Sequence, residues 1–183
     1  MTLLEIFGIK LGNCRRKHGN SQKELAEKLK KYVPFVTPSF QATSISNWEC
    51  GSSQMYIGTL WIICQLYDID TNYILDLPST DESIKNVLSD VAKNPVNIAN
   101  NFYTELGKFL AKKRHQYGFS QHDLSNLLYR HTNDTILDKF SPATISAWEC
   151  GKSRMSIGTF RELCKLYKLD AIKLLNLISE KII

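Results

Sequence analysis

The sequence predicts an all-α protein made of two tandem five-helix domains, joined by a connecting helix. A short stretch occurs twice, as TSISNWECGSSQM at 43–55 and as ATISAWECGKSRM at 143–155. Apolar residues recur at helical spacing in both halves, whereas the alternating pattern of a strand is absent. Serine and glycine also stand where helices would begin and end.

The repeat extends well beyond this stretch. Residues 45–68 align with 145–168 without a gap and are identical at 14 of 24 positions. Upstream, GNSQKELAEKL at 19–29 matches GFSQHDLSNLL at 118–128. Two copies are too few for a solenoid, which needs about three repeats. We therefore expect one domain over residues 1–77, a helical linker over 78–96 and a second domain over 97–183.

The first two helices of each copy have recognisable faces and caps. Gly19 and Gly118 end the first helix, and Ser21 and Ser120 begin the second, each with an acidic residue three positions later as in a capping box. The first helix is expected to bury Leu4, Phe7 and Leu11 in one copy and Phe102, Leu106, Phe109 and Leu110 in the other.

The remaining helices follow in the same order in both copies. The ISxWE stretch predicts a third helix, which Gly51 or Gly151 ends. An amphipathic fourth helix follows at IGTLWIICQLYDI and IGTFRELCKLYKL, and a short fifth at YILDL and IKLLNL.

A connecting helix is predicted over about residues 80–93. Ser79 and Glu82 have the spacing of a capping box, and Asn94-Pro95 closes the segment. An apolar stripe at helical spacing consists of Ile84, Val87, Leu88 and Val91. Such a stripe fits packing onto a neighbouring domain or, alternatively, a dimer seam.

Charge and cysteine content narrow the function classes. The net charge is +5, and it is uneven: residues 1–77 hold 8 Lys and Arg against 7 Asp and Glu, whereas residues 97–183 hold 13 against 8. Cys50 and Cys64 each have a counterpart 100 residues later, so we interpret them as small core residues. Reduced thiols in a cytosolic protein are expected, and no CxxC spacing predicts structural zinc.

Neither a membrane segment nor an enzyme is indicated. No window is long and apolar enough to span a bilayer, and the N-terminal MTLLEIFGIKLGNCRRK places its charge after its apolar part, unlike a secretory signal. The four histidines do not recur at equivalent places, and no phosphate loop or metal signature occurs. We expect a cytoplasmic protein with no catalytic residue, cofactor or metal.

An ordered set of four features occurs twice: a glycine, then Ser-Gln-x-x-Leu, then Ile-Ser-x-Trp-Glu-x-Gly, then an amphipathic helix. The whole set resembles the Cro/C1-type helix-turn-helix family, also called the XRE family, and covers all but about twenty central residues. The resemblance implies two lambda-repressor-like domains that bind double-stranded DNA.

The resemblance also assigns contacts to DNA phosphates. Gln22 and Gln121 open the second helix, where free N–H groups and the helix dipole favour phosphate oxygen. Lys152 and Arg154 follow the third helix, where the family touches the next phosphates. Ser52 is in the corresponding place in the first copy, which implies a weaker grip there.

Two ion pairs are implied in the same way. An arginine at the end of the first helix pairs with the glutamate of the WE word in the family. Carried over, this predicts pairs between Arg15 and Glu49 and between Arg114 and Glu149, both bidentate and partly buried. Their role is structural, because they would lock the first helix onto the third.

The third helix is implied to read the major groove with its N-terminal part. Asn and Gln can bond adenine through both atoms of the amide, and small apolar groups can touch the thymine methyl. Ser141 and Pro142 also fit an N-cap and first helical residue. The expected base-reading residues are Gln41, Thr43, Ser44 and Asn47 in the first copy and Ala143, Thr144 and Ala147 in the second.

A sequence-specific DNA-binding transcription regulator, more specifically a repressor using adjacent half-sites, is the leading interpretation. Both copies carry an insertion between the second and third helices, KKYVPFVTPSFQ and YRHTNDTILDKF, whose apolar residues are expected to pack under the loop. These insertions and the low charge of the first copy keep open an alternative: a protein-interaction module of the same fold, such as an antitoxin or nuclease inhibitor. Self-dimerisation also stays open.

Overall fold

The computed structural model describes residues 1–32, 35, 41–132 and 140–183. Every regular element in these residues is a helix, apart from an isolated bridge between Tyr56 and Ser156. This confirms the all-α class.

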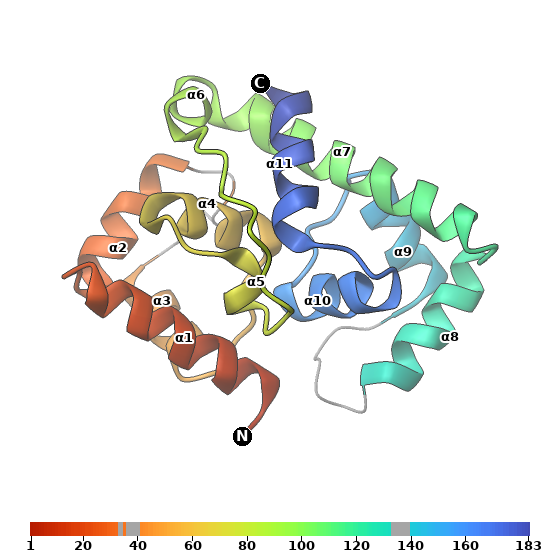
Figure 1. The fold of residues 1–183 in the computed structure, drawn as a ribbon, viewed down its shortest axis with the longest axis horizontal. Helices are drawn as coiled ribbons and strands as arrows, with labels where there is room; N and C mark the ends of the chain where they lie inside the picture. Colours follow the sequence, from red (N-terminus) through yellow and green to blue (C-terminus); the bar gives the residue numbers. More distant parts are fainter. Residues whose placement is uncertain (33–34, 36–40, 133–139) are drawn as a thin grey trace.

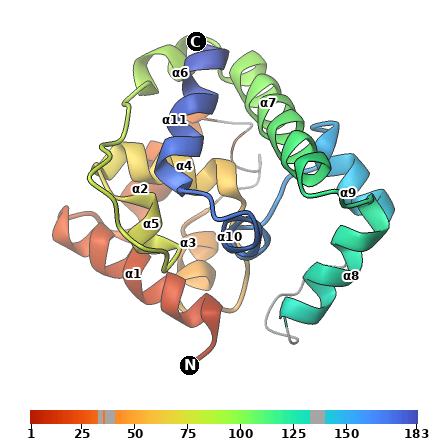
Figure 2. The same ribbon diagram turned by 45° about the vertical axis from the view of Figure 1, so that its right-hand side comes forward.

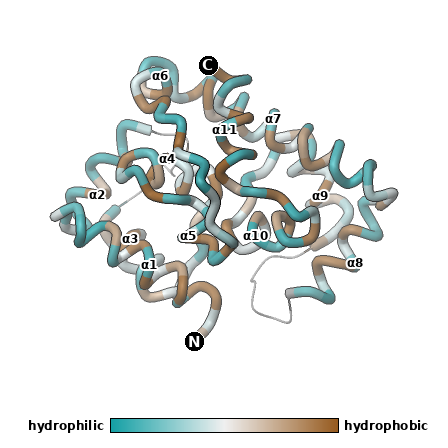
Figure 3. The backbone as a smooth tube through the Cα atoms, viewed as in Figure 1, coloured by the Kyte–Doolittle hydropathy of each residue, from teal (hydrophilic) through white to brown (hydrophobic). Residues whose placement is uncertain are grey.

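Helices occur in the same order in the two copies (Figure 1). The first copy contributes α1 (Leu3–Lys17), α2 (Gln22–Leu29), a 3-10 turn (Lys30–Tyr32), α3 (Ala42–Glu49), α4 (Ile57–Tyr67) and α5 (Thr71–Ile74). The second contributes α7 (Pro95–Gln116), α8 (Gln121–Thr132), α9 (Pro142–Glu149), α10 (Ile157–Leu166) and α11 (Ala171–Ile182), with α6 (Leu88–Lys93) between the copies. Figure 3 shows hydrophobic and hydrophilic stretches alternating along helices such as α7, as expected for helices with one buried face.

Local sequence accounts for the helix ends. The Ser21 hydroxyl accepts a hydrogen bond from the Glu24 N–H, and the Ser21 N–H donates to the Glu24 carboxylate, which completes the predicted capping box. Gly51 and Gly151 have φ of +73° and +68° after α3 and α9, a conformation that glycine adopts without the steric cost of a Cβ.

The prediction of a connecting helix over 80–93 is wrong for its first half, because only Leu88–Lys93 is helical. Tertiary hydrogen bonds hold the preceding backbone in an irregular conformation: the Lys85 N–H donates to the Asn176 side chain and the Val87 N–H to that of Gln65. Asn94 does not simply close the segment, since its side chain accepts from the Asn97 N–H and caps α7.

The apolar stripe of this segment packs inside the molecule. Val87 and Val91 are buried in the core, and Ile84 and Leu88 pack against it. The described structure therefore accounts for the stripe by internal packing.

The two copies share one continuous core. The rings of Trp61 from α4 and Phe102 from α7 stack with centroids 4.8 Å apart. Phe35, one of the insertion residues expected to pack, is fully buried beside both. Phe140 packs against Trp148 with ring centroids 6.2 Å apart, whereas Phe40 and Ile136 lie outside the described residues.

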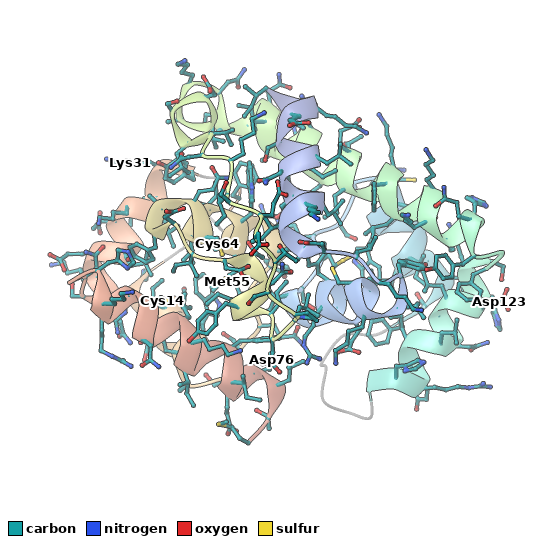
Figure 4. The ribbon with its side chains drawn as sticks, in the orientation of Figure 1. Cys14, Lys31, Met55, Cys64, Asp76 and Asp123 are labelled. Carbon is teal, nitrogen blue, oxygen red and sulfur yellow. The ribbon has the colours of Figure 1, made fainter. Side chains whose placement is uncertain are left out.

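The cysteine prediction was right for one pair only. Cys64 and Cys164 are buried, and Figure 4 shows Cys64 near the middle of the molecule. Cys50 and Cys150 are exposed because they follow the last residues of α3 and α9, so they are not core residues. All five thiols are free.

Equivalent residues of the two copies meet at the centre. The Ile57 N–H donates to the Met155 carbonyl, and the Ile157 N–H donates to the Met55 carbonyl, both at 2.9 Å. Figure 1 shows α1 and α7 on opposite sides of the molecule, whereas α5 and α11 lie next to each other near its middle. The copies are thus related by an approximate two-fold axis, which passes through the Tyr56–Ser156 bridge.

Candidate nucleic-acid interface

A hydrogen-bonded network joins α1, α2 and α3 in the first copy. Arg15 Nε donates to Glu49 Oε1 at 2.6 Å, and Nη2 donates to Oε2 at 2.9 Å. Gln22 Nε2 donates to the same Oε2 at 2.9 Å, and Arg15 Nη1 donates to the Asn20 carbonyl. One carboxylate therefore fixes the end of α1, the start of α2 and the end of α3 relative to one another.

The second copy repeats this network. Arg114 contacts Glu149 through Nε at 2.6 Å and Nη2 at 3.0 Å, and it also donates to the Phe119 carbonyl. Gln121 donates to Glu149 at 2.8 Å. Both ion pairs expected from the resemblance are present, with side chains only 7–11% exposed.

The electrostatics of the first network favour the charged carboxylate. Burial pushes the pKa of Glu49 upward, but hydrogen bonds from Arg15 and Gln22 outweigh it, and the pKa lies below its ordinary value. The pKa of Arg15 is raised, chiefly by its bond to Glu49. Both partners stay ionised at neutral pH.

The residues expected at DNA phosphates differ in their availability. Gln22 and Gln121 use their side-chain amides within the networks, which leaves the backbone N–H groups at the helix starts as the clearer donors. The Ser52 hydroxyl donates to the Asn47 carbonyl at the end of α3. Lys152 is exposed, whereas Arg154 is half-buried, with its guanidinium over the ring of Tyr56.

The base-reading candidates lie along the start and outer face of each third helix. Gln41, Thr43, Asn47 and Ala143 are exposed, and Ser44, Thr144 and Ala147 are half-buried. Ser44 and Thr144 also contribute to the helix starts, because the Gln41 N–H lies 3.5 Å from Ser44 Oγ and the hydroxyls of Ser141 and Thr144 share a hydrogen bond. Ser141 and Pro142 begin α9 as N-cap and first residue, as expected.

A pair of glycines that the sequence reasoning missed sets the distance between helices. A Cβ on Gly8 would lie 2.4 Å from the Glu49 carbonyl oxygen, and one on Gly107 would lie 2.3 Å from that of Trp148. Only glycine allows these backbones to come so close. The signal was present, since the two glycines are 99 residues apart, like the matched SQ words.

The two third helices lie on one side of the molecule. In Figure 1, α3 lies behind α1 and α9 lies behind α7, and in Figure 2 the two helices remain apart, with α10 between them. The approximate two-fold axis runs between them, so equivalent side chains of α3 and α9 can face one extended partner.

Neither a metal centre nor a membrane-spanning helix is found in the described ranges. No group of three or more His, Cys, Asp or Glu side chains there could hold a metal ion. No helix described is long and apolar enough to cross a membrane.

No family model matches the chain, and no significant match is found among curated proteins or solved structures.

Proposed function

We propose that this chain is a sequence-specific DNA-binding transcription regulator, in which α2–α3 and α8–α9 form two helix-turn-helix units that occupy adjacent half-sites. It would act in the cytoplasm as a repressor, by covering the DNA that it binds. The proposal rests on the sequence resemblance and assigns no catalytic role to any residue.

One observation carries the proposal most directly. The same four-part network of arginine, glutamate, glutamine and a turn carbonyl fixes the third helix in both copies. Beside each network, a third helix presents small polar or apolar side chains on the same side of the molecule. A rigid pair of surface helices related by a two-fold axis suits two half-sites of a duplex.

The test is a selection from a random duplex pool, followed by fluorescence anisotropy titrations at several salt concentrations. We expect one enriched site with two unlike halves, and affinity that falls as salt rises. The protein with Gln41→Ala, Asn47→Ala and Thr144→Ala is the control, and it should bind the enriched site no better than random DNA. Absence of binding by the parent to any duplex at low salt would overturn the proposal.

A second candidate, a protein-interaction module such as an antitoxin or nuclease inhibitor, also has an observation in its favour. Residues 41–51 and 141–151, which contain α3 and α9, include no Lys or Arg. A neutral surface of this kind suits a protein partner better than a polyanion. Failure of the DNA titration, together with a stable complex with the product of a neighbouring gene, would favour this candidate.

A further inference from the structure

The bridge between the copies presents one large side chain, that of Tyr56, outward near the two-fold axis. Met55 and Ile57 flank Tyr56 and are buried, as are Met155 and Ile157 around Ser156. Successive side chains of an extended segment point to opposite faces. Tyr56 therefore points away from the core, and it is 40% exposed.

The two copies differ at this position. Tyr56 corresponds to Ser156, which is buried and whose hydroxyl accepts from the Thr159 N–H at the start of α10. Arg154 corresponds to Gln54. The Arg154 guanidinium lies 5.9 Å from the centroid of the Tyr56 ring, so a residue of one copy rests on a residue of the other.

The Arg154 guanidinium is held on an aromatic ring, and the residues that the structure describes give it no acidic partner. No carboxylate within the described ranges pairs with it, in contrast to Arg15, Arg114 and Arg161. An aromatic face orients a guanidinium and leaves its N–H donors free at the rim. The axis thus carries one oriented cation, supplied by the second copy alone.

The geometry of a DNA duplex determines which groove would lie opposite this cation. Two third helices that occupy successive major grooves on one face of DNA have a minor groove midway between them. With α3 and α9 in those two major grooves, the two-fold axis through the bridge would run into that minor groove. There, every A·T pair shows only acceptors, whereas G·C adds the N2 amino group of guanine.

We propose that Arg154, held on the ring of Tyr56, enters the minor groove at the centre of the DNA site and selects A·T pairs there. A·T-rich minor grooves are narrow and strongly negative, and they attract arginine. This inference rests on the proposed function and adds a specificity residue that lies outside both third helices.

Inosine provides a discriminating probe. An inosine·C pair resembles G·C in the major groove, but it lacks the amino group in the minor groove. The enriched site is therefore prepared with A·T, G·C or inosine·C at its central base pairs, and each duplex is titrated by fluorescence anisotropy. We expect the parent to bind the A·T and inosine·C duplexes roughly fivefold or more tightly than the G·C duplex.

Residues of the other copy supply matched variants. R154Q places the side chain of Gln54 at the axis, and Y56S places that of Ser156 there. Both should bind the three duplexes within about twofold of one another, with little change on the G·C duplex. K152S, which introduces the side chain found at Ser52, should weaken all three equally and keep the preference. Thermal melting by circular dichroism checks that each variant is folded.

The outcomes separate this inference from the proposed function. Equal parent affinity for the three central sequences, or an inosine·C duplex that behaves like G·C, would overturn the minor-groove assignment while DNA binding stands. A preference that survives in R154Q would show that another residue makes the choice. No binding to any duplex would instead remove the proposed function itself.

Discussion

Arg114 and Glu149 depend on each other because both lie where water reaches poorly. The guanidinium of Arg114 donates to Glu149 and to the Phe119 carbonyl, and it also lies beside His115. Its side chain is only 7% exposed, so water can hardly replace these partners. A buried pair contributes modestly as a pair, but removal of one member leaves the other charge without compensation. The network is therefore sensitive to single changes.

Arg114→Ala should lower the free energy of unfolding by about 3–5 kcal/mol, because Glu149 then remains as an unpaired charge near the core. Urea denaturation of the variant and of Arg114→Ala with Glu149→Ala measures the effect. The double variant should recover part of the loss. A single variant as stable as the parent would mean that the pair is solvated.

Acid should weaken the first network in a predictable direction. The folded-state pKa of Glu49 is lowered, so its contribution is present above the ordinary glutamate pKa of about 4.3 and is lost as the pH falls through the folded value. The stability difference between the parent and Glu49→Gln should shrink below about pH 4.3. Denaturation midpoints between neutral and acid pH measure it, and a constant difference would contradict the assignment.

At the scale of helices, the sequence predicted helix ends correctly where neighbouring residues determine them. The prediction failed where residues distant in the sequence determine the backbone conformation. The capping residues Ser21 and Ser141 and the glycines at helix ends lie where their own neighbours require them. Residues 80–87 had equally good local signals, yet Asn176 and Gln65 offer side-chain acceptors for that backbone, and the helix does not form. No local pattern reveals partners that lie 22 residues away, as Gln65 does from Val87, or 91 residues away, as Asn176 does from Lys85.

The candidate site divides in the same manner. The ion pairs could be predicted from the family resemblance, because the arginine and the glutamate that form each pair occur at matching places in both copies. Arg154 was expected at a phosphate, but its place over Tyr56 depends on how the two copies pack, which the sequence of either copy alone does not contain.

Gly8→Ala should separate α1 from α3 and destabilise the protein by about 1–3 kcal/mol, since the new methyl group would press on the backbone of α3. Gly12→Ala is the matched control. Its Cβ would meet side-chain atoms at 3.2 Å or more, and the second copy already has Ala111 at that place. Thermal melting of both variants is the measurement; equal losses would argue against the close approach.

At the scale of the whole molecule, the shared core couples the copies. Trp61 and Phe102 come from different copies, and Arg161 of α10 donates to the Leu75 carbonyl and lies 3.5 Å from Asp76. Phe102→Ala should therefore lower the melting temperature of the entire chain in a single transition. Calorimetry that resolved two transitions in the parent would show that the copies unfold independently.

Charge is distributed unequally between the copies, and DNA affinity should follow it. Lys152→Ala should flatten the slope of log affinity against log salt by roughly one unit and weaken all DNA alike. Asn47→Ala should instead cost about 1–3 kcal/mol on the enriched site and little on random DNA. Anisotropy titrations across salt concentrations compare the two. An unchanged slope in the Lys152 variant would contradict a phosphate contact.

The reciprocal bonds of Ile57 and Ile157 also have a consequence for biosynthesis. Ile57 donates to Met155, which the ribosome adds about 100 residues later, or roughly 5–20 s at ordinary elongation rates. During that interval α4, buried along nearly its whole surface in the finished protein, has no second copy to cover it. The nascent first half therefore lacks the contacts that α7 and α10 make with this apolar helix, and we expect it to bind chaperones until the second copy has been made.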